Sequence, residues 1–244
     1  MIGLGTMINV ATVLIGGALG LLLGSRLPSK VRGTIMDGLG LLTLVIGISL
    51  ALETDNILIV LGSLLIGGIV GELLNIEDGI DRLGQWLERK TGARNGCTEE
   101  REARGSGSQF SYAFLMASLL FCVGPMTILG SIQDGLSGDY TLLAVKAVMD
   151  GFAALAFAST LGAGVLFSAL TVLVYQGALT LGANWASAAL SAPMTAEMTA
   201  TGGVLMLALG LGLLEIKRIR TGNLLPALIA APAIVSLAGW LGWL

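Results

Sequence analysis

Long stretches of this chain carry no charged residue. They are residues 1–25, 151–196, 198–214 and 221–244. A bilayer-spanning helix needs about 20 predominantly apolar residues, so each stretch is long enough to cross a membrane at least once. Charged residues make up only 12% of the chain and hydrophobic residues 55%, whereas soluble domains are about 25% charged. The sequence therefore predicts an all-α polytopic membrane protein.

The apolar segments predict eight transmembrane helices. They cover residues 2–24, 33–52, 57–74, 110–131, 141–159, 165–183, 199–214 and 224–243. The fourth segment is the least regular, because Gly124 and Pro125 interrupt it and a polar run over 131–135 follows. It is interpreted either as one broken helix or as a re-entrant segment.

Basic residues alternate between the predicted loops. All of them except Lys146, which falls inside a span, lie in the first, third and seventh loops: Arg26, Lys30, Arg32, Arg82, Arg89, Lys90, Arg94, Arg101, Arg104, Lys217, Arg218 and Arg220. Because Lys and Arg are enriched in cytoplasmic loops, we expect the odd-numbered loops in the cytoplasm and both termini outside. The alternation also supports the count of eight spans.

The third loop divides the chain into segments. Its residues 75–91 predict one amphipathic helix, which either lies on the membrane surface, packs beneath the bundle or simply connects two spans. We expect four segments: a first three-helix unit over 1–74, a cytoplasmic helix and linker over 75–108, a second three-helix unit over 109–183 and two C-terminal helices over 184–244.

A short motif occurs in both three-helix units. Residues 31–38 resemble residues 144–151, and both end in Met-Asp-Gly early in a span with a basic residue upstream. Units of three crossings must be inverted relative to one another, and inverted repeats are typical of secondary transporters. A match this short also arises by chance in so biased a composition. On the repeat hypothesis, the last two helices are additions for packing or homo-oligomerisation.

Asp37 and Asp150, the carboxylates of this motif, are candidates for an ion path. An ionisable residue at the centre of a membrane helix costs about 2.5–3.5 kcal/mol and commonly marks a substrate or ion pathway. The functional hypothesis is a pair of carboxylates that bind a cation or a proton. The alternative is local pairing near the interface, for which Lys146 stands four residues before Asp150 on one helix face.

The interrupted fourth span supplies further candidates. Gly124 and Pro125 break the helix, and freed carbonyls at such a break can coordinate ions. Thr127, Gln133 and Asp134 follow the break and are predicted to line a polar cavity. The alternative is a structural proline kink, which is common in membrane helices.

Polar residues in two other spans complete the predicted path. A Gly-x-Met match between residues 5–7 and 124–126 sets Thr6 and Asn9 of the first span opposite the break, and Gln176 occupies a similar position in the sixth span. These side chains either contact the solute or only hydrogen-bond neighbouring helices.

The sequence resembles a known family in three places. These are residues 3–9 with the glycines that follow them, residues 124–135 with Lys146 and Asp150, and residues 223–227. They are similar to the YqgA-like bacterial membrane proteins, the domain of unknown function 554 family. The resemblance covers essentially the whole chain and implies a bacterial inner-membrane protein, but it supplies no substrate.

The expected function is transport of a small solute or ion by a carrier or channel. Two acidic groups favour a cationic solute or coupling to Na⁺ or H⁺. The alternative is a non-transporting scaffold or regulator that acts through its cytoplasmic loop.

The chain has no histidine, which removes Ser-His-Asp catalysis and imidazole metal ligation, so we expect neither an enzyme nor a cofactor. The net charge of −3 argues against nucleic acid, and the expected partners are the lipid bilayer and the solute.

Overall fold

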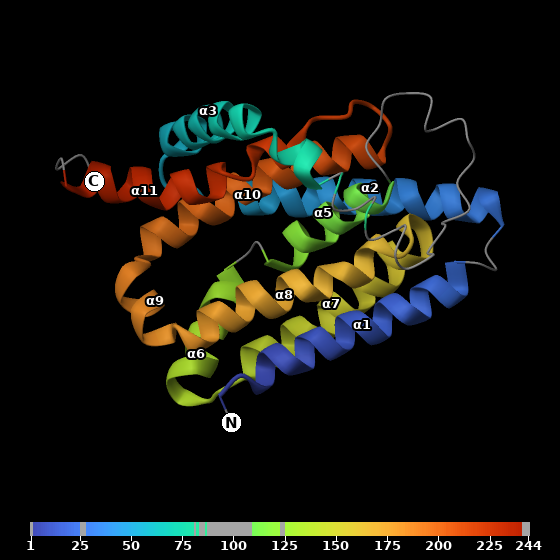
Figure 1. Cartoon of the computed structure of the whole chain (residues 1–244), viewed down its shortest axis with the longest axis horizontal. Helices are drawn as coiled ribbons and strands as arrows, with labels where there is room; N and C mark the ends of the chain where they lie inside the picture. The colour runs from blue at the N-terminus through green and yellow to red at the C-terminus, as the bar shows by residue number, and fades with distance from the viewer. Residues whose placement is uncertain are drawn as a thin grey trace.

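The computed structural model describes residues 2–24, 28–80, 82, 86, 109–122 and 125–240, and these residues form helices and short connections without strands. The elements are α1 (Leu4–Gly24), α2 (Ser29–Ala51), α3 (Ile57–Leu74), α5 (Gln109–Cys122), α6 (Pro125–Ser137), α7 (Thr141–Leu161), α8 (Gly164–Leu181), α9 (Ala183–Ala189), α10 (Ala192–Leu213), the 3₁₀ helix η2 (Thr221–Leu224) and α11 (Ala227–Trp240) (Figure 1).

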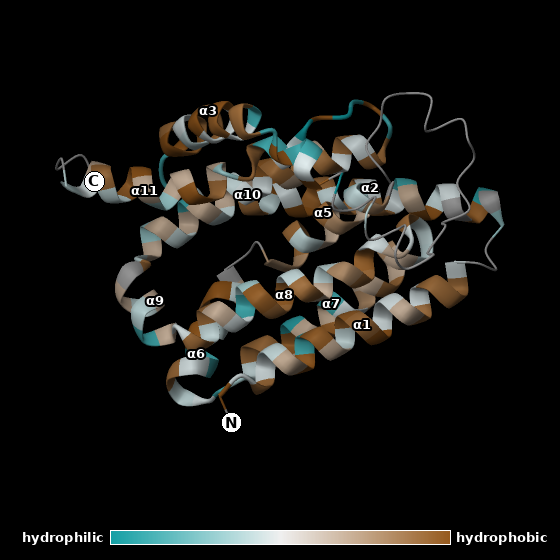
Figure 2. Ribbon diagram, viewed as in Figure 1, coloured by the Kyte–Doolittle hydropathy of each residue, from teal (hydrophilic) through white to brown (hydrophobic). Residues whose placement is uncertain are grey.

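The helices have the length and apolarity of membrane spans. Within the described residues, seven segments pass this test alone, and α5 and α6 pass it together as a pair bent by 59°. Large apolar side chains point outward, among them Ile15 at 61%, Leu170 at 62% and Ile229 at 76% exposure. Figure 2 shows apolar residues along every long helix. Lipid is the solvent that suits such a surface, which confirms the predicted all-α polytopic membrane fold.

Helix directions show how many times α5 and α6 cross. Gly16 of α1 lies against Gly151 of α7, and Gly24 lies against Ser159, so α1 and α7 run parallel. Two membrane helices run parallel only when an odd number of crossings separates them. Since α2 and α3 are two crossings, α5 and α6 together supply one more. The pair is therefore one broken span, which excludes the re-entrant alternative.

The ends of the broken span agree with this count. At the start of α5, the Phe110 carbonyl lies against Gly164, the first residue of α8. Near the end of α6, Gly135 lies against the Thr180 carbonyl close to the end of α8. The two short helices thus follow α8 from one end to the other, as a single crossing would.

The helices pack mainly in two groups. In the first, α1 packs along α7 and α8, and α5 packs on α8; in the second, α2 packs along α10, while α11 packs on α3 and α10 (Figure 1). The two predicted three-helix units therefore interlock, and their inverted relation stays a prediction.

α10 occupies a central position among the helices, and the expectation that the last two helices are additions to the repeats stays a prediction. The most apolar window of α10 is 67% buried, against 28% for α1. Small residues make this central position possible: a Cβ atom at Gly203 would lie 2.4 Å from the Ala51 backbone nitrogen of α2. Glycine lets the two backbones approach this closely.

The segment after α3, which the sequence predicts to be cytoplasmic, is described only in part. Asn75 ends α3 in the left-handed conformation, with φ 49°, and residues 76–80 are helical, as the predicted amphipathic helix requires. Apart from residues 82 and 86, the rest of that predicted helix and the linker over 92–108 lie outside the described residues.

Candidate functional site

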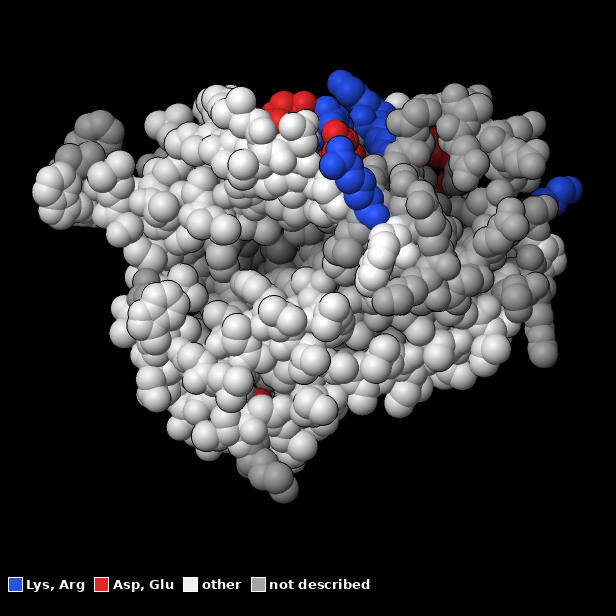
Figure 3. Space-filling view, viewed as in Figure 1, with Lys and Arg blue, Asp and Glu red and all other residues white. Residues whose placement is uncertain are grey.

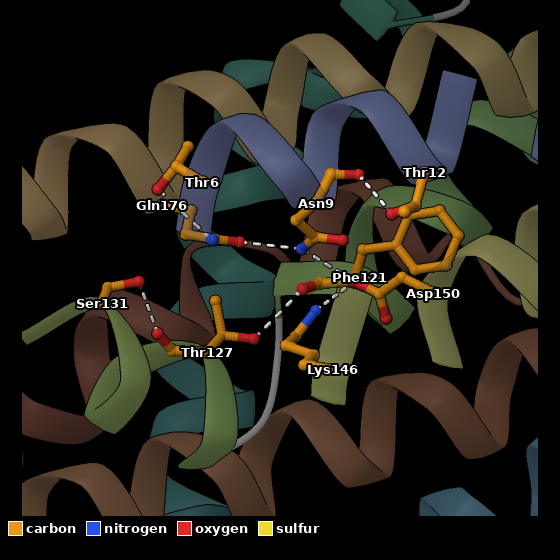
Figure 4. A network of polar contacts seen from close by, with 9 residues as sticks. All are labelled: Thr6, Asn9, Thr12, Phe121, Thr127, Ser131, Lys146, Asp150 and Gln176. Carbon is orange, nitrogen blue, oxygen red and sulfur yellow. Dashed lines mark hydrogen bonds and ion pairs between the residues drawn. The ribbon is translucent and has the colours of Figure 1, made fainter. Parts of the chain in front are cut away.

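A polar network lies inside the first helix group, where α1, α7 and α8 meet (Figure 4). Asn9 of α1 is fully buried at its centre. Its Nδ2 donates hydrogen bonds to Asp150 Oδ2 at 3.0 Å and to Gln176 Oε1 at 2.9 Å. One amide therefore joins a carboxylate on α7 to a second amide on α8.

Asp150 also forms an ion pair with Lys146, one turn earlier on α7. The two side chains are only 9% and 8% exposed. Removing two charges from water costs several kcal/mol per ion, and only close pairing and added hydrogen bonds offset that cost. The structure therefore shows the predicted local pairing of Asp150 with Lys146, and a role of this carboxylate in a cation path stays a prediction.

The network extends from Gln176 towards the N-terminus of α1. Gln176 Nε2 donates to Thr6 Oγ1 at 3.3 Å, and the Thr6 hydroxyl lies 3.3 Å from the Thr180 hydroxyl. One residue away, the backbone N–H of Gly5 donates to Asp134 Oδ2 at 3.2 Å. Side chains from α1, α6, α7 and α8 thus form a polar layer through the first helix group.

Two acceptors in this layer have no hydrogen-bond partner among the described residues. They are Asn9 Oδ1 and Asp134 Oδ1, and both residues are fully buried. The third such atom in the described part of the chain is the Thr199 hydroxyl on α10. An unsatisfied buried polar group costs about 1–3 kcal/mol, so each calls for an explanation. Both network atoms are oxygens that can only accept, which means that their natural partner is a donor or a cation.

The last turn of α5 and the first turn of α6 are joined by a hydrogen bond. The Phe121 carbonyl, in the last turn of α5, accepts a hydrogen bond from Thr127 Oγ1 at 3.1 Å. Figure 4 shows this carbonyl on the side of Lys146 and Asp150. The C-terminal end of a helix carries partial negative charge, and such ends of broken membrane helices commonly coordinate cations.

Most of the predicted path residues meet here, but some do not. Thr6, Asn9, Thr127, Asp134, Lys146, Asp150 and Gln176 are all buried in or beside the network. Asp37 is exposed on α2 and is not brought to Asp150. Gln133 is exposed and donates to Asp139 at 3.2 Å. Pro125 begins α6, and Gly124 lies outside the described residues.

The two copies of the repeated motif lie in different surroundings. Gly151, which follows Asp150, lies next to the Thr12 backbone of α1, whereas a Cβ atom at Gly38 would meet nothing within 4 Å. The same Asp-Gly pair therefore lies on a helix-packing face in α7 and on an open face in α2.

The structure gives roles to two buried polar residues outside the predicted path. Thr180 stands one turn after Gln176 on α8, so its spacing was a usable signal. Glu197 of α10 is 1% exposed and accepts hydrogen bonds from Thr54 Oγ1 at 2.7 Å and from the Asp55 and Asn56 backbone N–H groups at 2.9 Å each. It anchors the loop between α2 and α3, a role that depends on tertiary contacts alone.

On the face shown in Figure 3, most of the blue and red side chains of the described residues lie together at the upper edge. Among the exposed charges, Arg220 pairs with Glu72 at 2.7 Å and with Asp78 at 3.2 Å. At the loop before α7, hydrogen bonds from the Thr141 hydroxyl and backbone N–H hold the pKa of Asp139 below its usual value. The remaining surface in this view is largely uncharged, as a lipid-facing belt requires.

Together, the fold and the site define a polytopic helical membrane protein with an ion-paired polar centre beside a broken helix. The chain belongs to the family described as protein of unknown function (DUF554), whose model matches residues 4–236.

Two bacterial relatives are similar to it over nearly their whole length. Uncharacterized protein YqgA of Escherichia coli (strain K12) is 34% identical over 245 residues, which cover 98% of each chain. Uncharacterized membrane protein YdfK of Bacillus subtilis (strain 168) is 28% identical over 235 residues, which cover 95% of each chain. No solved structure matches the sequence.

Proposed function

We propose that this protein transports a small cation across the bacterial inner membrane, without enzymatic chemistry and with both termini outside. The observation that carries the proposal is the buried Lys146–Asp150 pair inside a network whose two unpartnered atoms, Asn9 Oδ1 and Asp134 Oδ1, are acceptors. A stable packing contact needs no unsatisfied oxygen. A route for cations needs free oxygen acceptors, because each ion must find oxygen ligands that replace its hydration water.

Lys146 is the internal competitor for the transported ion. Its ammonium neutralises Asp150 while no other cation is bound there. An arriving cation that takes the Asp150 carboxylate releases Lys146, and departure of the ion restores the pair. The pair thus lowers the cost of a buried carboxylate at the stage of the cycle without an ion.

The network ends abruptly on one side. Val13 lies one turn beyond Asn9 on α1 and is fully buried with Ala154 and Val165 in the apolar core. The polar layer therefore connects to the end of the bundle where α1 begins, while the opposite half is sealed by packed side chains. Transport needs a second arrangement of the helices that opens this seal.

A flux assay in proteoliposomes tests the proposal. The screen covers Na⁺, K⁺, H⁺, divalent cations and small amines, with Asp150→Asn as the test variant and Asp37→Asn as its matched control. A charged contact contributes about 1.5–3 kcal/mol, so we expect Asp150→Asn to lower flux about tenfold or more. Asp37 is exposed and outside the network, so its variant should transport like the wild type.

Two results would contradict the proposal. One is equal flux in Asp150→Asn and wild type. The other is no flux of any solute in protein that elutes as a folded species, which would favour a scaffold acting through the segment over 75–108.

A further inference from the structure

We infer that Asp134, whose carboxylate accepts from Gly5 next to Thr6 and whose neighbour Gly135 lies against Thr180, forms a second cation site that is specific for a monovalent ion and lies one turn of α1 outward from the Lys146–Asp150 pair. The inference rests on the proposed function and adds the class of ion and its first binding point. Its basis is a buried carboxylate that is only half satisfied.

Asp134 lies where three helices converge. Its Oδ2 accepts from Gly5 N–H at the start of α1, and its neighbour Gly135 lies against the Thr180 carbonyl of α8. Gly5 and Asn9 are separated by one turn of α1, so Asp134 is about 6 Å along the helix axis from the central amide. Thr6, the residue after Gly5 on α1, is hydrogen-bonded to Gln176 and Thr180 of α8.

A second buried carboxylate shows what a purely structural role looks like. Glu197 is 1% exposed, and both of its oxygens accept hydrogen bonds, three in total. Asp134 is fully buried with one hydrogen bond, and its Oδ1 has no partner among the described residues. Packing alone explains the first arrangement but leaves the second with an uncompensated acceptor.

The charge of the layer sets the class of ion. Lys146 and Asp150 cancel one another, which leaves the single negative charge of Asp134 and a partial positive charge of about 0.5 from the N-terminus of α1. One monovalent cation changes this sum from about −0.5 to about +0.5, whereas a divalent ion raises it to about +1.5 in a low-dielectric site. Ca²⁺ also takes 6–8 oxygen ligands with several carboxylates, and carboxylate and hydroxyl oxygens without nitrogen or sulfur suit hard cations.

Ion-dependent thermal unfolding of the purified full chain in detergent tests this site without transport. NaCl, LiCl or KCl is titrated against choline chloride at constant ionic strength, with CaCl₂ and MgCl₂ in parallel. We expect at least one alkali cation to raise the melting temperature of the wild type in a saturable way. Asp134→Asn keeps an amide oxygen that accepts from Gly5 N–H. Because this variant lacks the charged ligand, its half-saturating ion concentration should rise at least about tenfold.

Glu197→Gln is the matched control. It also neutralises a buried carboxylate, so its baseline melting temperature should fall while its ion dependence stays that of the wild type. If Asp134→Asn does not fold, Thr180→Val is used in its place, because this change replaces only the hydroxyl by a methyl group of similar size. It should raise the half-saturating concentration several-fold.

The outcomes separate this inference from the proposed function. The site is overturned if the melting temperature of Asp134→Asn, or of its substitute Thr180→Val, depends on the ion as that of the wild type does. This holds even if Asp150→Asn abolishes flux. Absence of any alkali-ion effect on the wild type, or a Ca²⁺ or Mg²⁺ effect that depends on Asp134, also overturns it. An Asp134-dependent alkali-ion effect supports the site even if no flux is found.

Discussion

The Lys146–Asp150 pair makes the most demanding prediction, which a double-mutant cycle can test. The side chains of Lys146 and Asp150 are 8% and 9% exposed. Lys146→Met or Asp150→Asn therefore leaves one buried charge without its partner. Breaking such a pair costs about 3–5 kcal/mol. For a chain of this size, about 1 kcal/mol shifts the melting temperature by about 2–4 °C. Each single variant should therefore unfold about 6–20 °C below the wild type.

The double variant Lys146→Met/Asp150→Asn should recover much of this loss. It contains no unpaired charge, and replacing a whole buried pair by neutral groups is often close to neutral in stability. The coupling energy between the two positions should exceed about 2 kcal/mol. Thermal unfolding in detergent, followed by tryptophan fluorescence at one heating rate, measures all four proteins.

A surface ion pair of the same chain is the control. The side chains of Arg220 and Glu72 are 50% and 56% exposed, so Arg220→Gln and Glu72→Gln should each change stability by less than about 1 kcal/mol. Additive losses in the Lys146/Asp150 cycle, or single variants no worse than these controls, would refute the view that the central pair is buried and mutually dependent.

Helix packing and the loop before α7 give two further predictions. Gly16→Ala would place a Cβ atom 2.1 Å from the Gly151 carbonyl oxygen; such overpacking costs about 1–3 kcal/mol, so the melting temperature should fall by about 2–12 °C. Gly38→Ala, whose Cβ meets nothing within 4 Å, should unfold no earlier than the wild type, and an equal loss in both would contradict the packing argument. The lowered pKa of Asp139, caused by Thr141, means that this carboxylate stabilises the fold above its ordinary pKa of 3.8 and loses that effect as the pH falls through the lowered value. Asp139→Ala should thus be less stable than the wild type at about pH 6 and equally stable in strong acid, and melting temperatures over this pH range would contradict the prediction if the difference persists in acid.

Local pattern was enough to predict the membrane class and most of the site. Apolar length alone places a helix in lipid, and Asn9, Asp150 and Gln176 were recognisable because polar side chains inside a span need a reason. The pairing of Lys146 with Asp150 followed from their spacing of four on one helix. Each of these inferences depends on neighbours along the chain.

Other features required the tertiary structure. A short motif does not determine which face of its helix packs against other helices. Asp37 and Asp150 therefore have the same local sequence, but in the structure Asp150 is buried and Asp37 is exposed. The central place of α10 depends on the fit of its glycines to α2, and no single helix contains that information.

The sequence by itself determined that this chain forms membrane-spanning helices, because the free energy of transferring a segment into lipid is a sum over its own residues. Only the tertiary structure decided that α5 and α6 make one crossing, that Asp134 meets the start of α1 and that its Oδ1 is left without a partner among the described residues. Hydrogen bonds between residues more than a hundred positions apart depend on how helices dock, and docking is set by the shapes of whole faces.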